Sequence, residues 1–251
     1  MIALDDPAWN ELYSAGNDAN ILLGNLLEGK HDFEEDMEIL AEDLSHQLSF
    51  YTMTAYVLPH LVDFCSKLSL DKQVFLIAQM GAAIAAEASD SLPSNTREYQ
   101  EFQEGLSGLR QVTERLVTDP RAIALLREDA ELGQEFALSA LSILGDRGHA
   151  YTLYLLSAYC WQNGHAACDC GWNDEEFPLD EQPDCIEPAC IGSWDGNSLE
   201  NEAVWFQGLL RLVDDKEITP VLPLIYGTGI CPECSKREPY WNWMDRFMNE
   251  Y

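Results

Sequence analysis

The chain has 251 residues, and its 14 Lys and Arg against 44 Asp and Glu give a formal net charge of −30 at pH 7. This excess of carboxylates argues against a nucleic-acid-binding protein and against docking on an anionic membrane, because Lys and Arg make most contacts with phosphate groups. Hydrophobic residues make up 47% of the chain, which is too many for a disordered acidic chain and enough to form a core. We therefore expect a folded protein of one large or two small domains.

The first 161 residues are predicted to be helical. Apolar side chains recur there every three or four residues, which is the spacing of one face of an amphipathic helix. No stretch before Trp161 alternates apolar and polar residues as a half-buried strand would. The predicted helices cover approximately residues 37–44, 53–68, 70–88, 99–116, a short segment after Asp119-Pro120, 136–144 and 149–161.

The chain changes character after Trp161. From Gly164 to about Gly196 it is rich in Gly, Pro, Asp, Asn and Cys and shows no sustained periodicity. An irregular loop of that length is uncommon inside a domain unless something other than packing holds it. Helical spacing then resumes at about Ser198, and a last helix is predicted around residues 240–247.

We therefore expect an all-α protein. Residues 1–161 would form a helical array, and residues 162–251 would form a Cys-containing irregular loop with C-terminal helices packed on that array as one domain. The sequence Val-Leu-Pro occurs at residues 57–59 and again at 221–223, each time inside an apolar helical pattern. A proline at a similar place in repeated helices is consistent with stacked helical hairpins.

One segment resembles a known family. Residues 43–62, which include His46-Gln47, Tyr51 and Val57-Leu58-Pro59, resemble the His-Gln … Tyr … Ala-Thr … Val-Pro-x-Leu stretch of bacterial HEAT-like repeat proteins. The segment 224–234 is similar to the ending that some of these proteins carry. A departure is Leu48, where the family pattern has Gly. The resemblance implies a HEAT-like α-α superhelix, and it implies the role of some family members, which is immunity to a toxin.

Six of the eight cysteines lie in irregular chain, whereas Cys65 and Cys160 lie in apolar helical patterns and are expected to be buried thiols. A Cys-x-x-Cys turn directs two thiolates at one point, and two such turns complete the tetrahedral shell that zinc prefers. We predict a zinc site formed by Cys168, Cys170, Cys231 and Cys234, in which Cys231-Pro-Glu-Cys234 has the usual spacing and Cys168-Asp-Cys170 is one residue shorter. Four thiolates leave no open position for a reactive water, so the predicted zinc is structural.

Other readings of the cysteines remain open. A different zinc set is possible from His165, Cys185 and Cys190. Cys185 and Cys190 are also close enough in sequence for a disulfide, or the thiols carry no ligand. A redox Cys-x-x-Cys is disfavoured because no βαβ pattern surrounds it.

The expected location is cytoplasmic, since the chain starts without a signal-peptide pattern and no stretch approaches about 20 uninterrupted apolar residues. Phosphate-binding Gly-rich loops, His-Glu-x-x-His and Gly-x-Ser-x-Gly are absent from the sequence, which favours a non-enzymatic protein.

The acidic charge is concentrated in the chain. No Lys or Arg occurs between Arg147 and Arg211, while carboxylates accumulate there. A surface of one charge sign steers and selects a partner of the opposite sign. We therefore predict a protein that binds a basic partner, namely an immunity protein that binds and occludes a cognate bacterial toxin. The alternatives are a helical adaptor or scaffold with another partner and, third, a zinc-dependent enzyme. The residues predicted to contact the partner are Trp172, Asp174, Glu175, Glu176, Asp180 and Glu181.

Overall fold

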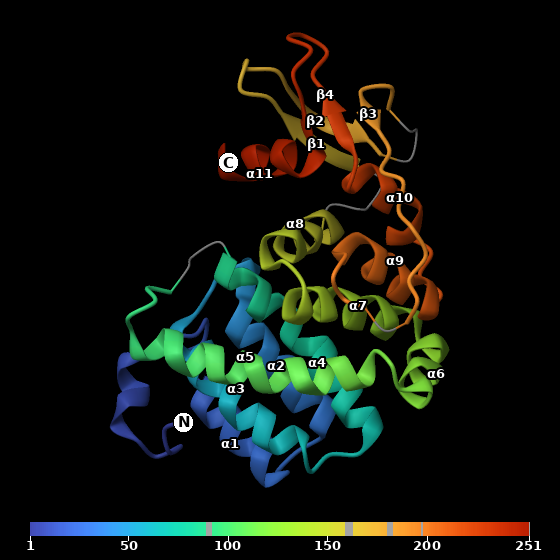
Figure 1. Ribbon diagram of the computed structural model, residues 1–251. Helices are drawn as coiled ribbons and strands as arrows, with labels where there is room; N and C mark the ends of the chain where they lie inside the picture. The colour runs from blue at the N-terminus through green and yellow to red at the C-terminus, as the bar shows by residue number, and fades with distance from the viewer. Residues whose placement is uncertain (89–91, 159–162, 180–182, 197, 251) are drawn as a thin grey trace. The chain divides into compact units, whose positions relative to one another are not determined.

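The structure is a computed structural model that describes residues 1–88, 92–158, 163–179, 183–196 and 198–250 (Figure 1). It divides into two compact units, Met1–Tyr151 and Thr152–Tyr251, and the division falls within helix α8 (Arg147–Ala158). None of the helices in these ranges is long and apolar enough to cross a lipid bilayer.

All the regular elements described in the first unit are helices. Its elements are α1 (Ala19–Glu28), α2 (Phe33–Ser45), α3 (Thr52–Cys65), α4 (Leu70–Ala85), α5 (Arg97–Leu116), α6 (Pro120–Glu128) and α7 (Ala130–Leu144), with 3-10 turns at Pro7–Glu11, His46–Leu48 and Ala86–Ala88. The helical prediction for α2 to α7 is therefore confirmed, whereas α1 was not predicted.

These helices lie in two layers. One layer contains α1, α3 and α5, and the other contains α2, α4 and α7, with α6 packed against α4 and α7 (Figure 1). Within each layer neighbouring helices pack side by side, and across the layers α1 packs on α2, α3 on α4 and α5 on α7. The buried faces supply a core in which Leu23, Met37, Leu58, Phe102 and Phe136 are almost fully enclosed.

Helix starts follow the capping rules. The carboxylates of Asp32, Asp119 and Asp129 accept hydrogen bonds from first-turn N–H groups of α2, α6 and α7. Asp119 followed by Pro120 was predicted to begin a helix, and this is confirmed.

Two glycines set the distance between α3 and α5. A Cβ atom on Gly105 would lie 2.4 Å from Leu58 Cβ, and one on Gly108 would lie 2.5 Å from Val62 Cγ1. Real Cβ atoms do not approach this closely, so the two helices touch where α5 has no side chain.

The turn after α2 contains two consecutive residues in a left-handed conformation. Gln47 and Leu48 both have positive φ angles, 55° and 53°, in the left-handed region that glycine occupies at little cost. Leu48 adopts this conformation at a cost of about 1 kcal/mol or more.

The second unit combines short strands with helices. After α8 it contains β1 (Asn163–Ala167), β2 (Asn173–Pro178), β3 (Ile186–Glu187), α9 (Glu202–Leu212), α10 (Ile218–Ile225), β4 (Thr228–Ile230), β5 (Arg237–Pro239) and α11 (Tyr240–Glu250). Strands β1 and β2 form an antiparallel hairpin, and β3, β4 and β5 form an antiparallel sheet in that order.

The expectation of an irregular region between residues 164 and 196 is therefore wrong in part. Strands of two to six residues form there, and such short strands need no visible alternation in the sequence. The predicted start of α9 at about Ser198 is also wrong, because the helix begins at Glu202 and Asn201 Oδ1 caps it by accepting from Val204 N–H. The predicted last helix is confirmed as α11.

Candidate metal centre

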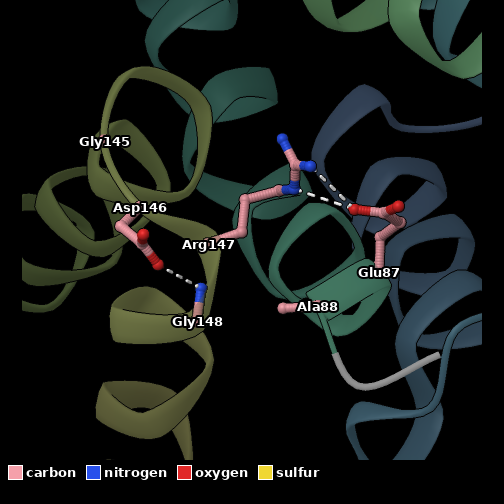
Figure 2. A pocket seen from close by; sticks show the side chains of 6 residues that line it. All are labelled: Glu87, Ala88, Gly145, Asp146, Arg147 and Gly148. Atoms are coloured by element: carbon pink, nitrogen blue, oxygen red, sulfur yellow. Dashed lines mark hydrogen bonds and ion pairs between the residues drawn. The ribbon is translucent and has the colours of Figure 1, made fainter. Parts of the chain in front are cut away.

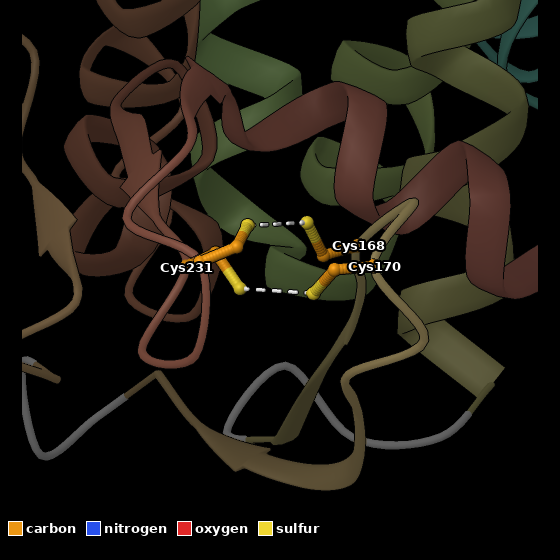
Figure 3. Close-up of side chains that lie close together, drawn as sticks. Cys168, Cys170 and Cys231 are labelled. Atoms are coloured by element: carbon orange, nitrogen blue, oxygen red, sulfur yellow. Dashed lines mark hydrogen bonds between the residues drawn. The ribbon is translucent and has the colours of Figure 1, made fainter.

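Two tight turns carry the predicted zinc ligands. Cys168 and Cys170 lie in the turn between β1 and β2, and Cys231 and Cys234 lie in the turn between β4 and β5. Each turn therefore closes an antiparallel hairpin, and the strands hold its ends. The sequence separates the two turns by about 60 residues, and the fold brings them together (Figure 3).

The two turns share a backbone feature. The residue directly after the second cysteine has a positive φ angle in both, 96° at Gly171 and 60° at Ser235. In the first turn Cys168 N–H donates to Trp172 O at 2.8 Å, and in the second Cys231 N–H donates to Lys236 O at 2.9 Å. These bonds close each loop, so its two thiols face the same side.

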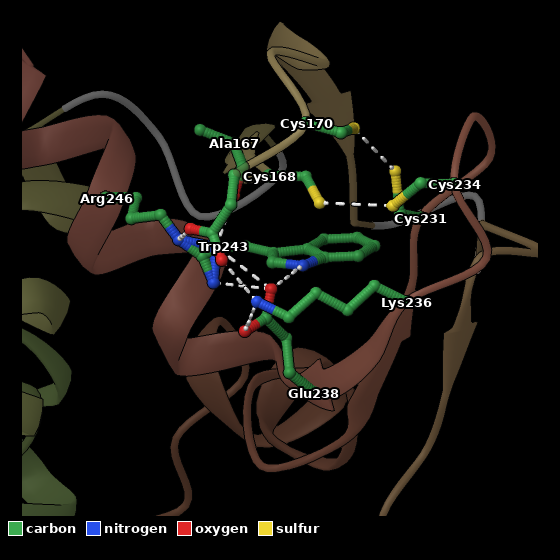
Figure 4. Close-up of polar contacts among 10 residues, drawn as sticks. Ala167, Cys168, Cys170, Cys231, Cys234, Lys236, Glu238, Trp243 and Arg246 are labelled. Carbon is green, nitrogen blue, oxygen red and sulfur yellow. Dashed lines mark hydrogen bonds and ion pairs between the residues drawn. The ribbon is translucent and has the colours of Figure 1, made fainter.

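The four sulfurs lie at the spacing of a tetrahedral thiolate site. Cys168 Sγ is 3.7 Å from Cys234 Sγ, and Cys170 Sγ is 3.6 Å from Cys231 Sγ (Figures 3 and 4). All four sulfurs lie within 4.8 Å of one another. Four thiolates around one zinc, each at about 2.3 Å, would be about 3.8 Å apart. The observed cluster therefore fits a metal of this size, and it is the set of cysteines that the sequence predicted.

Backbone N–H groups point at the sulfurs. Cys170 N–H hydrogen-bonds to the Cys168 sulfur. Burial opposes ionisation of the Cys231 thiol, but N–H groups of Cys234 and Glu233 donate to its sulfur and the pKa falls to about 7. Burial dominates at Cys168 and raises its pKa to about 12, so this thiol needs a neighbouring cation to ionise. A divalent metal supplies that charge.

A charged network lies beside the cluster (Figure 4). Asp169, which stands between the first two cysteines, forms ion pairs with Lys236 and with Arg246, the latter at 2.9 Å. Glu238 also pairs with both cations, and its Oε1 accepts from Trp243 Nε1 at 3.0 Å. The two cations and the two carboxylates balance in charge, so the network links the first turn to β5 and α11 without adding net charge beside the thiols.

The sequence analysis missed this network. Lys236 and Asp169 are 67 positions apart, and Arg246 also donates to Ala167 O across 79 positions. A usable signal was present, because Lys236 follows the Cys-x-x-Cys motif by two residues in a chain with few basic residues.

The aromatic side chains complete the surroundings of the first turn. Trp172 packs edge-on against Trp243 with ring centroids 5.2 Å apart, and Trp243 also contacts Tyr240 at 6.1 Å. Trp243 and Tyr240 are fully buried, whereas Trp172 is half-buried. Packing of α11 against β1 therefore supports the turn that holds Cys168 and Cys170.

The remaining cysteines lie elsewhere. Cys190 is a free, exposed thiol, so the disulfide with Cys185 is not formed, and neither residue belongs to the four-thiol cluster. Cys65 is buried in α3 as predicted, and burial raises the pKa of its thiol to about 11. His165 lies on β1, and Cys160 falls outside the described residues.

The predicted partner-binding residues are grouped around the β1–β2 hairpin. Trp172 stands at the end of the turn, and Asp174, Glu175 and Glu176 lie on β2. Asp180 and Glu181 fall outside the described residues.

A polar pocket of about 290 Å³ lies in the first unit (Figure 2). Within it Arg147 pairs with the buried Glu87 through two contacts of 2.9 Å. Asp146 Oδ1 accepts from Gly148 N–H at 2.8 Å. Arg147 and Glu87 thus pair with each other, and the Asp146 carboxylate accepts from a backbone N–H.

Comparisons with known proteins gave no relatives. No protein-family model matches the chain, and neither the curated proteins nor the solved structures contain a match.

Proposed function

We propose that this chain is a non-enzymatic protein-binding module that binds and occludes a basic protein, and that this protein is a cognate bacterial toxin. The observation that carries the proposal is the charge on the exposed face of α2. The exposed residues of α2 before Ser45 are Glu34, Glu35, Glu38, Ile39 and Glu42, so this face carries four carboxylates and no cation. Such a face attracts Lys and Arg and repels other acidic proteins.

The arrangement of helices supports a HEAT-like array. Helices α1–α2, α3–α4 and α5–α7 form successive hairpins that pack in two layers, with α6 inserted in the last. An array of this kind presents long helix faces to a protein partner. A toxin as that partner rests on the resemblance of residues 43–62 and on the charge, since nucleases and other toxins that act on nucleic acid are basic.

We also propose that Cys168, Cys170, Cys231 and Cys234 bind one zinc ion with a structural role. The spacing of the sulfurs supports this ligand set, and four thiolates fill a tetrahedral shell. The ion would tie the β1–β2 hairpin to the β4–β5 hairpin, since one turn of each supplies two ligands. Metal analysis of the purified chain is expected to give one zinc per chain.

The decisive experiment is co-expression with the protein encoded by the adjacent gene. The proposal predicts that the chain protects cells from that protein and forms a complex with it that weakens as salt is raised. If the chain neither protects cells nor forms a salt-sensitive complex, immunity must be abandoned. A stable complex with a host protein, without protection, would instead identify an adaptor.

Metal removal tests the enzymatic alternative. If zinc is structural, the second unit unfolds when a chelator removes the metal. Zinc that leaves while the strands and helices of that unit persist would instead support an open, catalytic site.

A further inference from the structure

The exposed large apolar side chains that the structure describes all lie early in the sequence. Among the described residues, the exposed large hydrophobic side chains are Met1, Tyr13, Ile21 and Ile39, all within the first 39 positions. Ile21 on α1 is 57% exposed, and Ile39 on α2 is 47% exposed. Single exposed apolar residues are ordinary, but two on neighbouring helices, in a segment rich in carboxylates, indicate a surface that another molecule contacts.

Both isoleucines belong to the hairpin that ends the helical stack. Helix α1 packs on α2 and α3, and α2 packs on α1 and α4, so each is the outermost helix of its layer. Figure 1 shows α1 at the edge of the first unit. The chain reverses between the helices through residues 29–32, which brings Ile21 and Ile39 to similar heights along the hairpin.

Carboxylates flank both isoleucines. Glu35 and Glu42 stand four residues before and three residues after Ile39, so the three side chains share one face of α2. Asp18 precedes Ile21 by three residues, at the start of α1. All five side chains are exposed, and we call Asp18, Ile21, Glu35, Ile39 and Glu42 the hairpin surface.

Charge decides which kind of protein fits this surface. A second copy of the chain would place carboxylates against carboxylates, which disfavours association. The cations described near these residues are few: Lys30 pairs with Glu28 at 3.0 Å, and His46 contacts Glu42 at 2.5 Å. A partner that carries Lys or Arg beside apolar side chains satisfies both features of the surface.

We propose that the hairpin surface docks an amphipathic basic helix of another protein, a conclusion that rests on the proposed binding of a basic partner. Apolar residues of that helix contact Ile21 and Ile39, and its Lys or Arg residues pair with Glu35 and Glu42. A helix fits because the surface is the open end of two helix layers, where the next element to pack is a helix.

The test uses two synthetic peptides of about 18 residues, about five helical turns. One has Leu at helical spacing and Lys elsewhere, and the other has the same Lys residues with Ser in place of Leu. Fluorescence anisotropy measures their binding to the full chain, and far-UV circular dichroism confirms that each variant is folded. We expect the Leu peptide to bind at least about tenfold more tightly than the Ser peptide, because it alone can cover the isoleucines.

Three double variants locate the binding. Ile21→Ser with Ile39→Ser is expected to weaken binding of the Leu peptide about tenfold. Glu35→Gln with Glu42→Gln should weaken binding of the Leu peptide about fivefold and reduce the salt dependence of that binding. The matched control is Glu104→Gln with Glu114→Gln, which removes the same charge from exposed positions of α5 in the other layer and should change affinity less than about twofold.

Several outcomes overturn the proposal. Equal weakening by the α5 control, or equal binding of the Ser peptide, would show that the overall charge alone attracts the peptide. A dimer that Ile39→Ser abolishes in light-scattering measurements would make a second copy the occupant. If the wild-type chain protects cells from the adjacent gene product and the double isoleucine variant protects equally well, the hairpin surface is wrong while the immunity role stands. If the wild-type chain gives no protection, the immunity role fails, and the peptide results still decide the surface.

Discussion

Replacing one cysteine of the cluster is expected to unfold the second unit and leave the first folded. Cys170→Ser removes one of four metal ligands at an exposed position, so the substitution itself costs little packing. The ion would cross-link positions 170 and 231, which are 61 residues apart, and a cross-link over a loop of that length is worth about 4 kcal/mol in the chain-entropy model. A domain of this size is stable by about 5–15 kcal/mol, so a loss of at least this amount removes a large share of the stability.

Two spectroscopic signals separate the units. Trp9 is in the first unit and the other six tryptophans are in the second, so tryptophan fluorescence follows the second unit. Far-UV circular dichroism follows mainly the helices of the first. We expect Cys170→Ser to bind no zinc in a colorimetric assay and to lose the fluorescence transition of the second unit, while most of the far-UV helicity is retained.

The matched control is Cys190→Ser, an exposed thiol outside the cluster. It should keep one zinc per chain and the wild-type midpoint. The reasoning is refuted if Cys170→Ser keeps its zinc and its fluorescence transition, or if Cys190→Ser loses zinc to the same extent.

Three substitutions test the first unit. Leu48→Gly should raise the free energy of unfolding by about 1 kcal/mol, because glycine adopts the left-handed backbone conformation without strain. If urea unfolding shows a lower free energy of unfolding, the Leu48 side chain stabilises the fold by more than the strain costs. Gly105→Ala should lower the same quantity by about 1–3 kcal/mol despite the better helix propensity of Ala, since its Cβ would collide with Leu58; unchanged stability would show that α3 and α5 separate easily. Burial and the carboxylates of three neighbouring acidic residues raise the pKa of Glu135 in the folded chain, so its ionisation destabilises the fold as pH rises through that pKa. Glu135→Gln, which can still accept from Gln79, should therefore be more stable than wild type by about 0.5 kcal/mol at pH 7 and no more stable at pH 4; a gain of equal size at both pH values would exclude the electrostatic cause.

Most helices of the first unit were predictable because their buried side chains recur at regular spacing along the sequence. Met37, Leu40 and Leu44 repeat along α2 at three and four residues, and all three are fully buried. Helix α1 escaped prediction although Ala19, Leu23 and Leu26 have the same spacing. Its exposed Ile21 and half-buried Leu22 and Leu27 blur the contrast between its two faces.

The metal ligands were predictable for a different reason. Two cysteines in one short turn lie close together whatever the rest of the fold, as in Cys231-Pro-Glu-Cys234 and the shorter Cys168-Asp-Cys170, so the sequence left only the pairing of the two turns to be inferred. The residues that support the cluster depend on long-range contacts. The ion pairs of Lys236 and Arg246 with Asp169 join segments far apart in the sequence, and no local sequence pattern predicts such pairs. The strands escaped prediction because β3, β4 and β5 have two or three residues each.

The two units rely on different interactions, and this separates the two surfaces proposed to bind a partner. The hairpin surface belongs to the first unit, which buries an apolar core of its own and contains no cysteine of the cluster. The carboxylates Asp174, Glu175 and Glu176 belong to β2, which follows directly on the turn that carries Cys170. Unfolding of the second unit in Cys170→Ser should therefore abolish any binding that β2 provides and leave the hairpin surface able to bind its helix. If this variant still binds the Leu peptide but no longer binds the protein partner, the partner needs both surfaces, and each is a separate part of one interface. Loss of both would show that the first unit depends on the second for its fold.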